Sequence, residues 1–147
     1  MIVIYILGYF IIILISIYLI LSLSGFLILK KGQQPFDYQV LENDGGKYVI
    51  TNDSRKVEYF VFGNTDPQSK VIICIHGSGP EAVSEVNFNE KCCIELGLKG
   101  IAISLPGYGF SDMKPGRQVV DWPREDLEAV LKKEGVEKFM IMGHSQG

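Results

Sequence analysis

The sequence predicts an α/β fold built on a mostly parallel sheet and preceded by a transmembrane helix. Two observations support this prediction. Three apolar runs of strand length, at 71–75, 101–105 and 139–142, alternate with segments of helical pattern, as in a chain of strand–helix–strand units. Before them, no charged residue occurs from Ile2 to Leu29. That stretch is longer than the roughly 20 apolar residues a helix needs to cross a bilayer.

Residues 1–31 are predicted to be a retained membrane anchor that ends at two lysines, Lys30 and Lys31. A cleaved signal peptide is the alternative, because Ser22–Ser24 has the small-x-small pattern of a cleavage site. However, the apolar run is longer than a signal core and lacks a basic start. A buried core helix fits less well, since such helices seldom run this long without a charge. The lysines follow the anchor, which favours a cytosolic domain; the sequon at 52–54 favours the opposite side but is a pattern common by chance.

The length of the chain is sufficient for one domain but not for two. The 147 residues are 47% hydrophobic and 21% charged, with a net charge of −3, and no basic stripe indicates a nucleic-acid partner. The cysteines are Cys74, Cys92 and Cys93. An odd number with two neighbours does not predict a disulfide framework, and no histidine lies at a zinc-ligand spacing. We therefore expect no metal site and no cofactor.

The first part of the domain is predicted to be β-rich. Residues 32–46 form a polar connector, with a short strand near Tyr38–Leu41, and the domain covers 47–147. Its runs at 47–51 and 57–62 are rich in β-branched and aromatic residues and are separated by a short polar turn, which predicts a hairpin.

The second part is predicted to alternate buried strands with helices. The run 71–75 is continuously apolar, as in strands covered on both faces, and 101–105 and 139–142 are predicted as further buried strands. Helices are expected at 85–96 and at 121–135, each followed or ended by glycine. Pro123 lies in the first turn of the second helix, where its missing N–H costs nothing. The apolar stripe of that helix consists of Leu127, Val130 and Leu131.

Each of the three buried strands ends in a glycine-rich turn. The turns are His76–Pro80, Pro106–Ser111 and Gly143–Gly147, and open α/β sheets bind their ligands at these carboxyl ends. The last turn reads G-x-S-x-G. A serine held on a sharp strand-to-helix turn requires glycine two residues to either side, because a side chain there would collide with the turn.

These three motifs, in this order and at these spacings, resemble the α/β-hydrolase superfamily of the serine-hydrolase type. The resemblance covers residues 48–147, the N-terminal half of such a domain. It implies that Ser145 is the catalytic nucleophile. It also implies an oxyanion hole made by the backbone N–H groups of Ser78 and Gln146.

The resemblance assigns no catalytic role to the two histidines. It implies that His76 belongs to the oxyanion turn and that His144 is a structural residue of the elbow. Ser104 stands where an acidic residue is common in the family, and we interpret this departure as structural variation without consequence for the mechanism.

In this family the acid and the histidine follow the nucleophile in the chain, whereas the sequence stops two residues after Ser145. We therefore expect the chain to be a fragment of a longer protein. Its strand at 139–142 would then be an exposed apolar edge. We expect residues 32–147 alone to be poorly soluble and inactive, so turnover of a p-nitrophenyl ester would contradict this interpretation.

The expected function is that of a membrane-anchored serine hydrolase. It would cleave an ester, amide or thioester of a small-molecule or lipid-like substrate through an acyl-serine intermediate. The alternative is a non-catalytic, membrane-anchored binding or scaffold protein with the same fold; the intact motif at Ser145 argues against it. An epoxide hydrolase or dehalogenase is disfavoured, because those relatives have an aspartate at this position. A downstream acid and histidine would support the enzyme.

Overall fold

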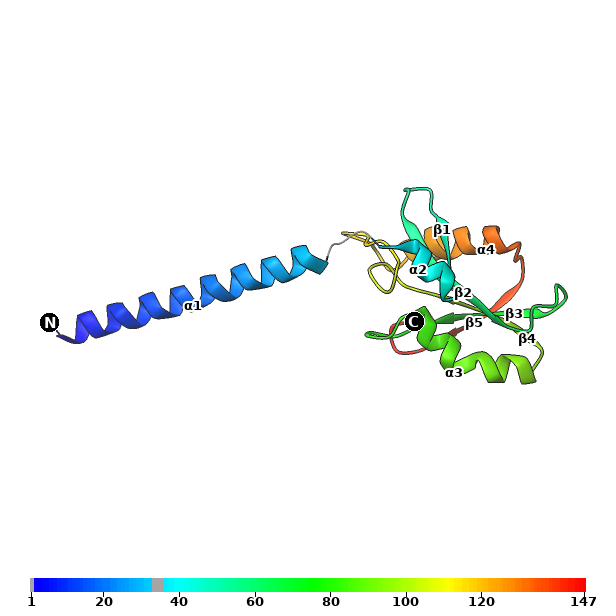
Figure 1. Cartoon of the computed structure of the whole chain (residues 1–147), viewed down its shortest axis with the longest axis horizontal. Helices are drawn as coiled ribbons and strands as arrows, with labels where there is room; N and C mark the ends of the chain where they lie inside the picture. The colour runs from blue at the N-terminus through cyan, green and yellow to red at the C-terminus, as the bar shows by residue number, and fades with distance from the viewer. Residues whose placement is uncertain (1, 33–35) are drawn as a thin grey trace. The chain divides into compact units, whose positions relative to one another are not determined.

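The computed structural model describes residues 2–32 and 36–147, with side chains for 8, 9, 11–25 and 36–147. The chain divides into two units, Met1–Phe36 and Asp37–Gly147. The first unit contains one helix, α1, which spans Ile2–Gly32 over 31 residues (Figure 1). Among the residues that the structure describes, no helix is both long and apolar enough to cross a bilayer. The structure does not confirm the transmembrane anchor predicted at 1–31, which stays a prediction.

The second unit contains every strand and helix that the sequence predicts from residue 47 onward, with ends that shift by a few residues (Figure 1). In chain order its elements are α2 (Tyr38–Asn43), β1 (Lys47–Ile50), β2 (Lys56–Gly63), β3 (Lys70–Ile75), α3 (Ala82–Glu95), β4 (Leu98–Ile103), η1 (Pro123–Leu127), α4 (Glu128–Glu134) and β5 (Phe139–Gly143). The predicted helix at 121–135 is thus a π-helical turn, η1, continued by α4. Gly135 ends it with a left-handed φ of 65°, as predicted.

The short strand predicted at 38–41 is wrong, because these residues form the helix α2. The carboxylate of Asp37 accepts a hydrogen bond from Gln39 N–H over 3.0 Å and so caps the first turn. Leu41 is only 1% exposed and packs among apolar side chains on the α3 face of the sheet. A capped turn with one buried apolar side chain is more stable here than an isolated strand.

The sheet has the strand order β1-β2-β4-β3-β5. β2 pairs antiparallel with both β1 and β4, whereas β3 pairs parallel with both β4 and β5. Over these residues the sheet is therefore mixed and not mostly parallel, because the hairpin adds two antiparallel pairings. The three strands that end in glycine-rich turns, β3, β4 and β5, form the parallel part, so their turns meet at one edge.

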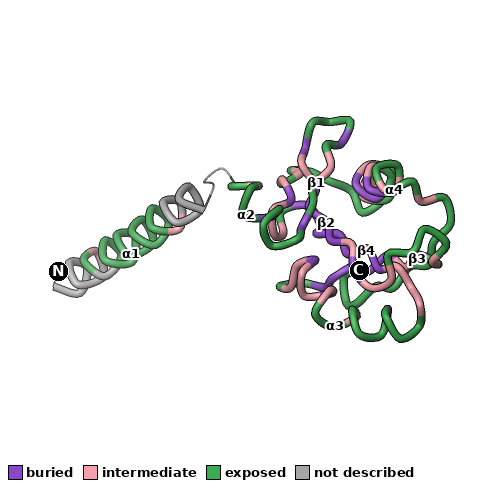
Figure 2. The backbone as a smooth tube through the Cα atoms, turned by 45° about the vertical axis from the view of Figure 1, so that its right-hand side comes forward, coloured by how far each residue is buried: buried purple, intermediate pink, exposed green. Residues whose placement is uncertain are grey.

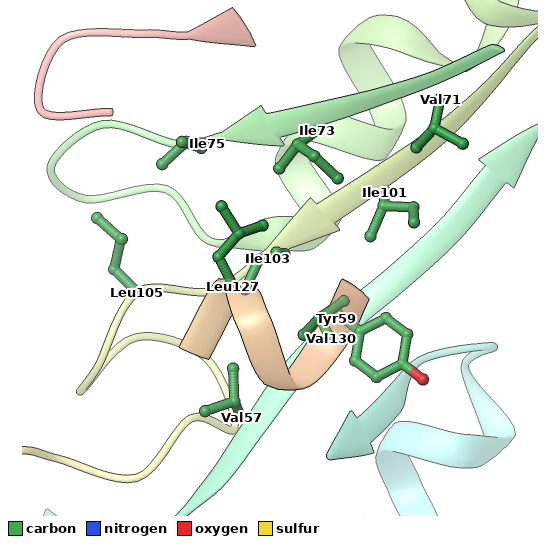
Figure 3. Close-up of a cluster of buried hydrophobic side chains, with 10 residues drawn as sticks. All are labelled: Val57, Tyr59, Val71, Ile73, Ile75, Ile101, Ile103, Leu105, Leu127 and Val130. Atoms are coloured by element: carbon green, nitrogen blue, oxygen red, sulfur yellow. The ribbon is translucent and has the colours of Figure 1, made fainter. Parts of the chain in front are cut away.

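Both faces of the central strands are covered. Figure 3 shows one apolar cluster, in which β2, β3 and β4 direct side chains toward Leu127 and Val130. The opposite face packs against α3 and includes Cys74 and Cys93, which are free thiols. Burial raises the pKa of Cys74 to about 12. Burial is concentrated along β2 and β4 in Figure 2, which agrees with the buried strand predicted at 101–105.

β5 lies at the edge of the sheet and is exposed. Within residues 36–147 it pairs only with β3, and the side chains of Phe139–Met142 are 37% to 55% exposed. The expectation of an apolar edge strand at 139–142 is confirmed.

Candidate active site at the carboxyl edge of the sheet

Ser145 sits on a tight turn directly after β5. Its φ is 58°, in the left-handed region that non-glycine residues seldom adopt. The N–H of His144 donates to the carbonyl of Ile75 over 3.1 Å, and Gly147 N–H donates to the His144 carbonyl over 3.0 Å. These two bonds tie the turn to β3 and close it, so that Ser145 lies exposed at its outer corner.

The glycines on either side of this turn have no room for a side chain. A Cβ on Gly143 would lie 2.4 Å from the carbonyl carbon of Gly147. A Cβ on Gly147 would lie 2.4 Å from the carbonyl oxygen of Ile75. Both distances involve backbone atoms and are shorter than any normal contact of a Cβ. The expectation that the spacing G-x-S-x-G avoids a collision is confirmed.

The turn after β3 lies against the turn that carries Ser145. A Cβ on Gly77 would be 2.8 Å from Ser145 Cβ and 3.1 Å from the carbonyl oxygen of His144, so the two backbones are in close contact. Ser78 follows immediately and is exposed. The structure therefore brings Ser145, Gln146 and the segment with Ser78 together.

His76 is fully buried and both of its ring nitrogens are engaged. Leu105 N–H donates to Nε2 over 2.9 Å, so the neutral ring carries its proton on Nδ1, which lies 2.7 Å from the Gly77 carbonyl oxygen. The ring also meets that of Tyr108 edge-on at 4.8 Å. His76 thus joins the ends of β3 and β4 and has no free nitrogen for a proton from Ser145. The structural role assigned to His144 stays a prediction.

A hollow of about 310 Å³ opens beside the turn. Gln146 and Gly147 form one side of it, Trp122 and Pro123 belong to another, and Arg117 contributes a positive charge. A larger hollow of about 470 Å³ lies along β1 and contains none of the motif residues. Size alone therefore does not identify the site.

Comparison with known proteins gives relatives that are longer than this chain. No family model matches the chain. It is 27% identical over 108 residues to a 2-hydroxy-6-oxononadienedioate/2-hydroxy-6-oxononatrienedioate hydrolase of Escherichia coli K12, covering 69% of this chain and 36% of that protein. It is 26% identical over 114 residues to a hydrolase of the same name from Cupriavidus pinatubonensis, covering 74% and 39%. The chain thus spans 36% to 39% of the length of these relatives.

Solved structures share the architecture. An alpha/beta hydrolase from Novosphingobium aromaticivorans superposes with a TM-score of 0.56 at 23% identity, covering 69% of this chain and 35% of that one. An esterase from Exiguobacterium antarcticum superposes with a TM-score of 0.59 at 19% identity, covering 69% and 36%. The second unit has the α/β-hydrolase fold. Within this fold, the three glycine-rich turns occupy one end of the parallel strands.

Ser104 and Glu58 form a buried hydrogen-bonded pair at this edge that the sequence pattern did not predict. Ser104, interpreted from the sequence as variation without consequence, is fully buried, and its hydroxyl donates to Glu58 Oε2 over 2.5 Å. Glu58 itself is 2% exposed. The available signal was a single carboxylate inside the apolar strand run at 57–62, because a buried charge requires polar partners.

The α/β-hydrolase unit was also searched for side chains that could bind a metal ion. Among the residues that the structure describes, no three side chains of histidine, cysteine, aspartate or glutamate gather in a way that could hold a metal ion.

Proposed function

We propose that this chain carries the nucleophile and the oxyanion hole of a serine hydrolase that cleaves an ester, amide or thioester. The observation that supports this best is the backbone of Ser145, which has a φ of 58° between two glycines that cannot bear a Cβ. Strained backbone of this kind concentrates at functional sites. A protein that only bound a ligand would have no need of it.

In the proposed reaction, Ser145 Oγ attacks the carbonyl carbon of the substrate while a base takes the hydroxyl proton. The carbonyl oxygen becomes negative and is stabilised by the N–H groups of Ser78 and Gln146. The leaving group departs with a proton, and water then hydrolyses the acyl-serine bond. Because both nitrogens of His76 are engaged, we do not assign the base to this histidine.

The proposed substrate is a small-molecule or lipid-like acyl compound, and the proposal includes no metal, cofactor or nucleic acid. The relatives support this class, since their names describe hydrolases of dienedioates and an esterase. A thioesterase domain from the curacin biosynthetic pathway also superposes, with a TM-score of 0.57 at 18% identity.

Labelling by a fluorophosphonate tests the nucleophile. We expect the full-length protein to be labelled and Ser145→Ala to abolish labelling, because the reagent bonds covalently to a serine that a base activates. Ser84→Ala in α3 is the control and should be labelled like the unsubstituted protein. Absence of labelling in the unsubstituted protein would favour the alternative, a non-catalytic binding or scaffold protein with this fold.

We also propose that residues 1–31 anchor the protein in a membrane, with the domain in the cytosol. The uncharged run from Ile2 to Leu29 extends on both sides of the α1 side chains that the structure describes. Large apolar side chains at successive positions of α1, including Ile11–Ile15, are 49% to 60% exposed. A helix that is apolar on all sides is stable in a protein core or in lipid.

Alkaline carbonate extraction tests the anchor. The full chain should stay in the membrane pellet, whereas a variant lacking residues 1–31 should be released. Release of the full chain would contradict membrane anchoring. If the full chain stays in the pellet, protease protection of the domain in sealed vesicles distinguishes a cytosolic domain from one on the opposite side.

A further inference from the structure

Glu58 and Ser104 form a buried polar pair on the face of the sheet that α3 covers. Side chains alternate along a strand, so Glu58 lies on the same side of β2 as Phe60, which belongs to the α3-facing cluster. The Ser104 hydroxyl donates to Glu58 Oε2 over 2.5 Å, and Phe110 N–H donates to the same oxygen over 3.2 Å. A carboxylate that is 2% exposed is costly without such donors.

The bond to Glu58 fixes the direction of the Ser104 hydroxyl. A hydroxyl has one proton to donate and lone pairs to accept with. Because the proton goes to Glu58, the lone pairs of Ser104 are available to Ala82 N–H, which lies 3.0 Å away. Ala82 is the first residue of α3, and Glu81 at the N-cap makes no side-chain capping bond. Ser104 therefore satisfies one of the first N–H groups of α3, which have no acceptor within the helix.

The end of β4 thus holds both ends of the turn that carries Ser78. Leu105 N–H binds His76 Nε2 at the start of the turn, and the Ser104 hydroxyl binds Ala82 N–H at its end. Ser78 lies between these two fixed points, in the turn that contacts Ser145 through Gly77.

A second position is adapted to the carboxylate. Gly109 has a φ of 51°, and a Cβ there would lie 2.0 Å from Glu58 Oε2 and 3.0 Å from Ser104 Oγ. The loop after β4 therefore leaves space for the carboxylate and the hydroxyl together. An apolar side chain at position 58 would have a lower desolvation cost, but it could not accept the hydrogen bonds of Ser104 and Phe110.

Building on the proposed function, we infer that Glu58 is a positioning residue for the oxyanion hole. It acts through the Ser104 hydroxyl, which fixes the turn at 76–82 and with it the direction of the Ser78 N–H. Neither residue touches the substrate.

The test measures the rate constant for fluorophosphonate labelling of Ser145 in the full-length protein. Glu58→Gln and Ser104→Ala should each slow labelling by roughly 10- to 100-fold, as expected when a donor is misplaced by a fraction of its bond length. The double variant should be no slower than either single variant, because both changes break the same chain of bonds. Glu81→Gln is the control: it removes a charge beside the same turn and should change the rate less than about twofold. Thermal unfolding of each variant verifies the fold.

A second readout separates positioning from stability. Amide hydrogen exchange in the segment 76–82 should accelerate in Glu58→Gln and Ser104→Ala and stay unchanged in Glu81→Gln. Ser104→Thr retains the hydroxyl and should restore both labelling and protection. If Glu58→Gln does not fold, the comparison of Ser104→Ala with Ser104→Thr tests the positioning role.

The outcomes distinguish the two proposals. Labelling at the normal rate in Glu58→Gln, or losses that simply add in the double variant, would overturn the role of Glu58. If the unsubstituted protein is not labelled at all, the hydrolase proposal fails. Exchange in the segment 76–82 then decides alone: acceleration supports the positioning role, and unchanged protection overturns it.

Discussion

At the scale of single residues, the backbone geometry of Ser145 depends on the absence of side chains at Gly143 and Gly147. A left-handed conformation costs a non-glycine residue about 1–2 kcal/mol, and here it is held by the bonds of His144 N–H and Gly147 N–H. Those bonds form only because the backbones of Gly143, Gly147 and Ile75 approach each other without side chains between them. The exposed hydroxyl is therefore a consequence of the surrounding backbone and not of Ser145 alone.

Gly143→Ala should disrupt this turn. Its new Cβ would meet the carbonyl carbon and oxygen of Gly147 at 2.4 and 2.5 Å, and backbone atoms cannot move aside as a flexible side chain can. We expect Ser145 labelling to fall by roughly 100-fold, since displacements of about 1 Å have effects of this size.

Gly25→Ala in α1 is the control for that experiment. A Cβ on Gly25 has no atom within 4 Å, and alanine favours a helix by about 1 kcal/mol over glycine. Labelling should be unchanged in this variant. Equal labelling of Gly143→Ala and the unsubstituted protein would show that the turn tolerates a side chain.

Interactions between residues close in the sequence could be predicted, whereas an interaction between distant residues was missed. The collision at Gly143 and Gly147 is local, so the spacing of the motif was enough to predict it. The bond between Glu58 and Ser104 joins residues 46 positions apart. It depends on the antiparallel register of β2 and β4, which the hydrophobic pattern does not specify.

At the scale of elements, an ion cluster fastens the β1–β2 hairpin to the helix that precedes β5. Arg55 lies in the hairpin turn, next to β2. Its Nη2 is 2.6 Å from Asp126 and 3.1 Å from Glu125, both in η1, and its Nε is 2.9 Å from Asp53. The Asp126 side chain is 1% exposed. Burial raises the pKa of Asp126, although Arg55 opposes this shift.

Arg55→Met should destabilise the domain by about 3–5 kcal/mol, because it leaves the Asp126 carboxylate buried without its partner. Denaturant unfolding measures the loss. Arg55→Met combined with Asp126→Leu should recover much of it, since the double variant has no unpaired buried charge. Lys91→Ala is the control: its pair with Glu95 has side chains 89% and 65% exposed, and such pairs contribute less than about 1 kcal/mol. A small effect of Arg55→Met would show that the cluster is not stabilising.

Glu134 joins the end of α4 to the sheet in a pH-dependent way. Burial alone would raise its pKa, but hydrogen bonds from Lys47 and Tyr59, assisted by Lys99, outweigh this and lower the pKa below the usual 4.5. A lowered pKa stabilises the folded state above the unfolded pKa, and this stability is lost as the pH falls through the folded value.

Glu134→Gln should therefore destabilise the domain by about 1–2 kcal/mol at neutral pH. The difference from the unsubstituted protein should shrink as the pH falls below about 4. Thermal unfolding at several pH values checks this, with the exposed Glu90→Gln as control. A difference that stays constant from neutral to acidic pH would mean that the carboxylate charge of Glu134 is not responsible.

The bounds of the helices and strands show which elements the hydrophobic pattern could predict. The bounds of β3 and β5 were predicted to within a residue, because their apolar runs are bounded by polar residues and glycine. α2 was predicted as a strand, because its six residues are too few to show a helical period. Its helix depends on the cap from Asp37 and on the burial of Leu41, which only the tertiary structure reveals.

At the scale of the whole unit, the sheet has one protected and one unprotected edge strand. β1 has only four residues, and short edge strands resist pairing with another chain. Its Lys47 side chain forms an ion pair with Glu134. β5 presents four consecutive apolar side chains that are 37% to 55% exposed, with only β3 as a partner within residues 36–147. Apolar edge strands without charges are templates for pairing with another chain.

We therefore expect residues 32–147 to self-associate through β5. Ile141→Lys places a charge in the middle of this edge, where Ile141 is 55% exposed, and should shift the protein toward monomers without loss of secondary structure, because inward or edge charges oppose strand pairing. Val119→Lys is the matched control, since Val119 is 91% exposed but lies in a loop outside the sheet. Sedimentation velocity distinguishes the cases. If both substitutions improve solubility equally, general surface charge is responsible and the edge of β5 is not the site of association.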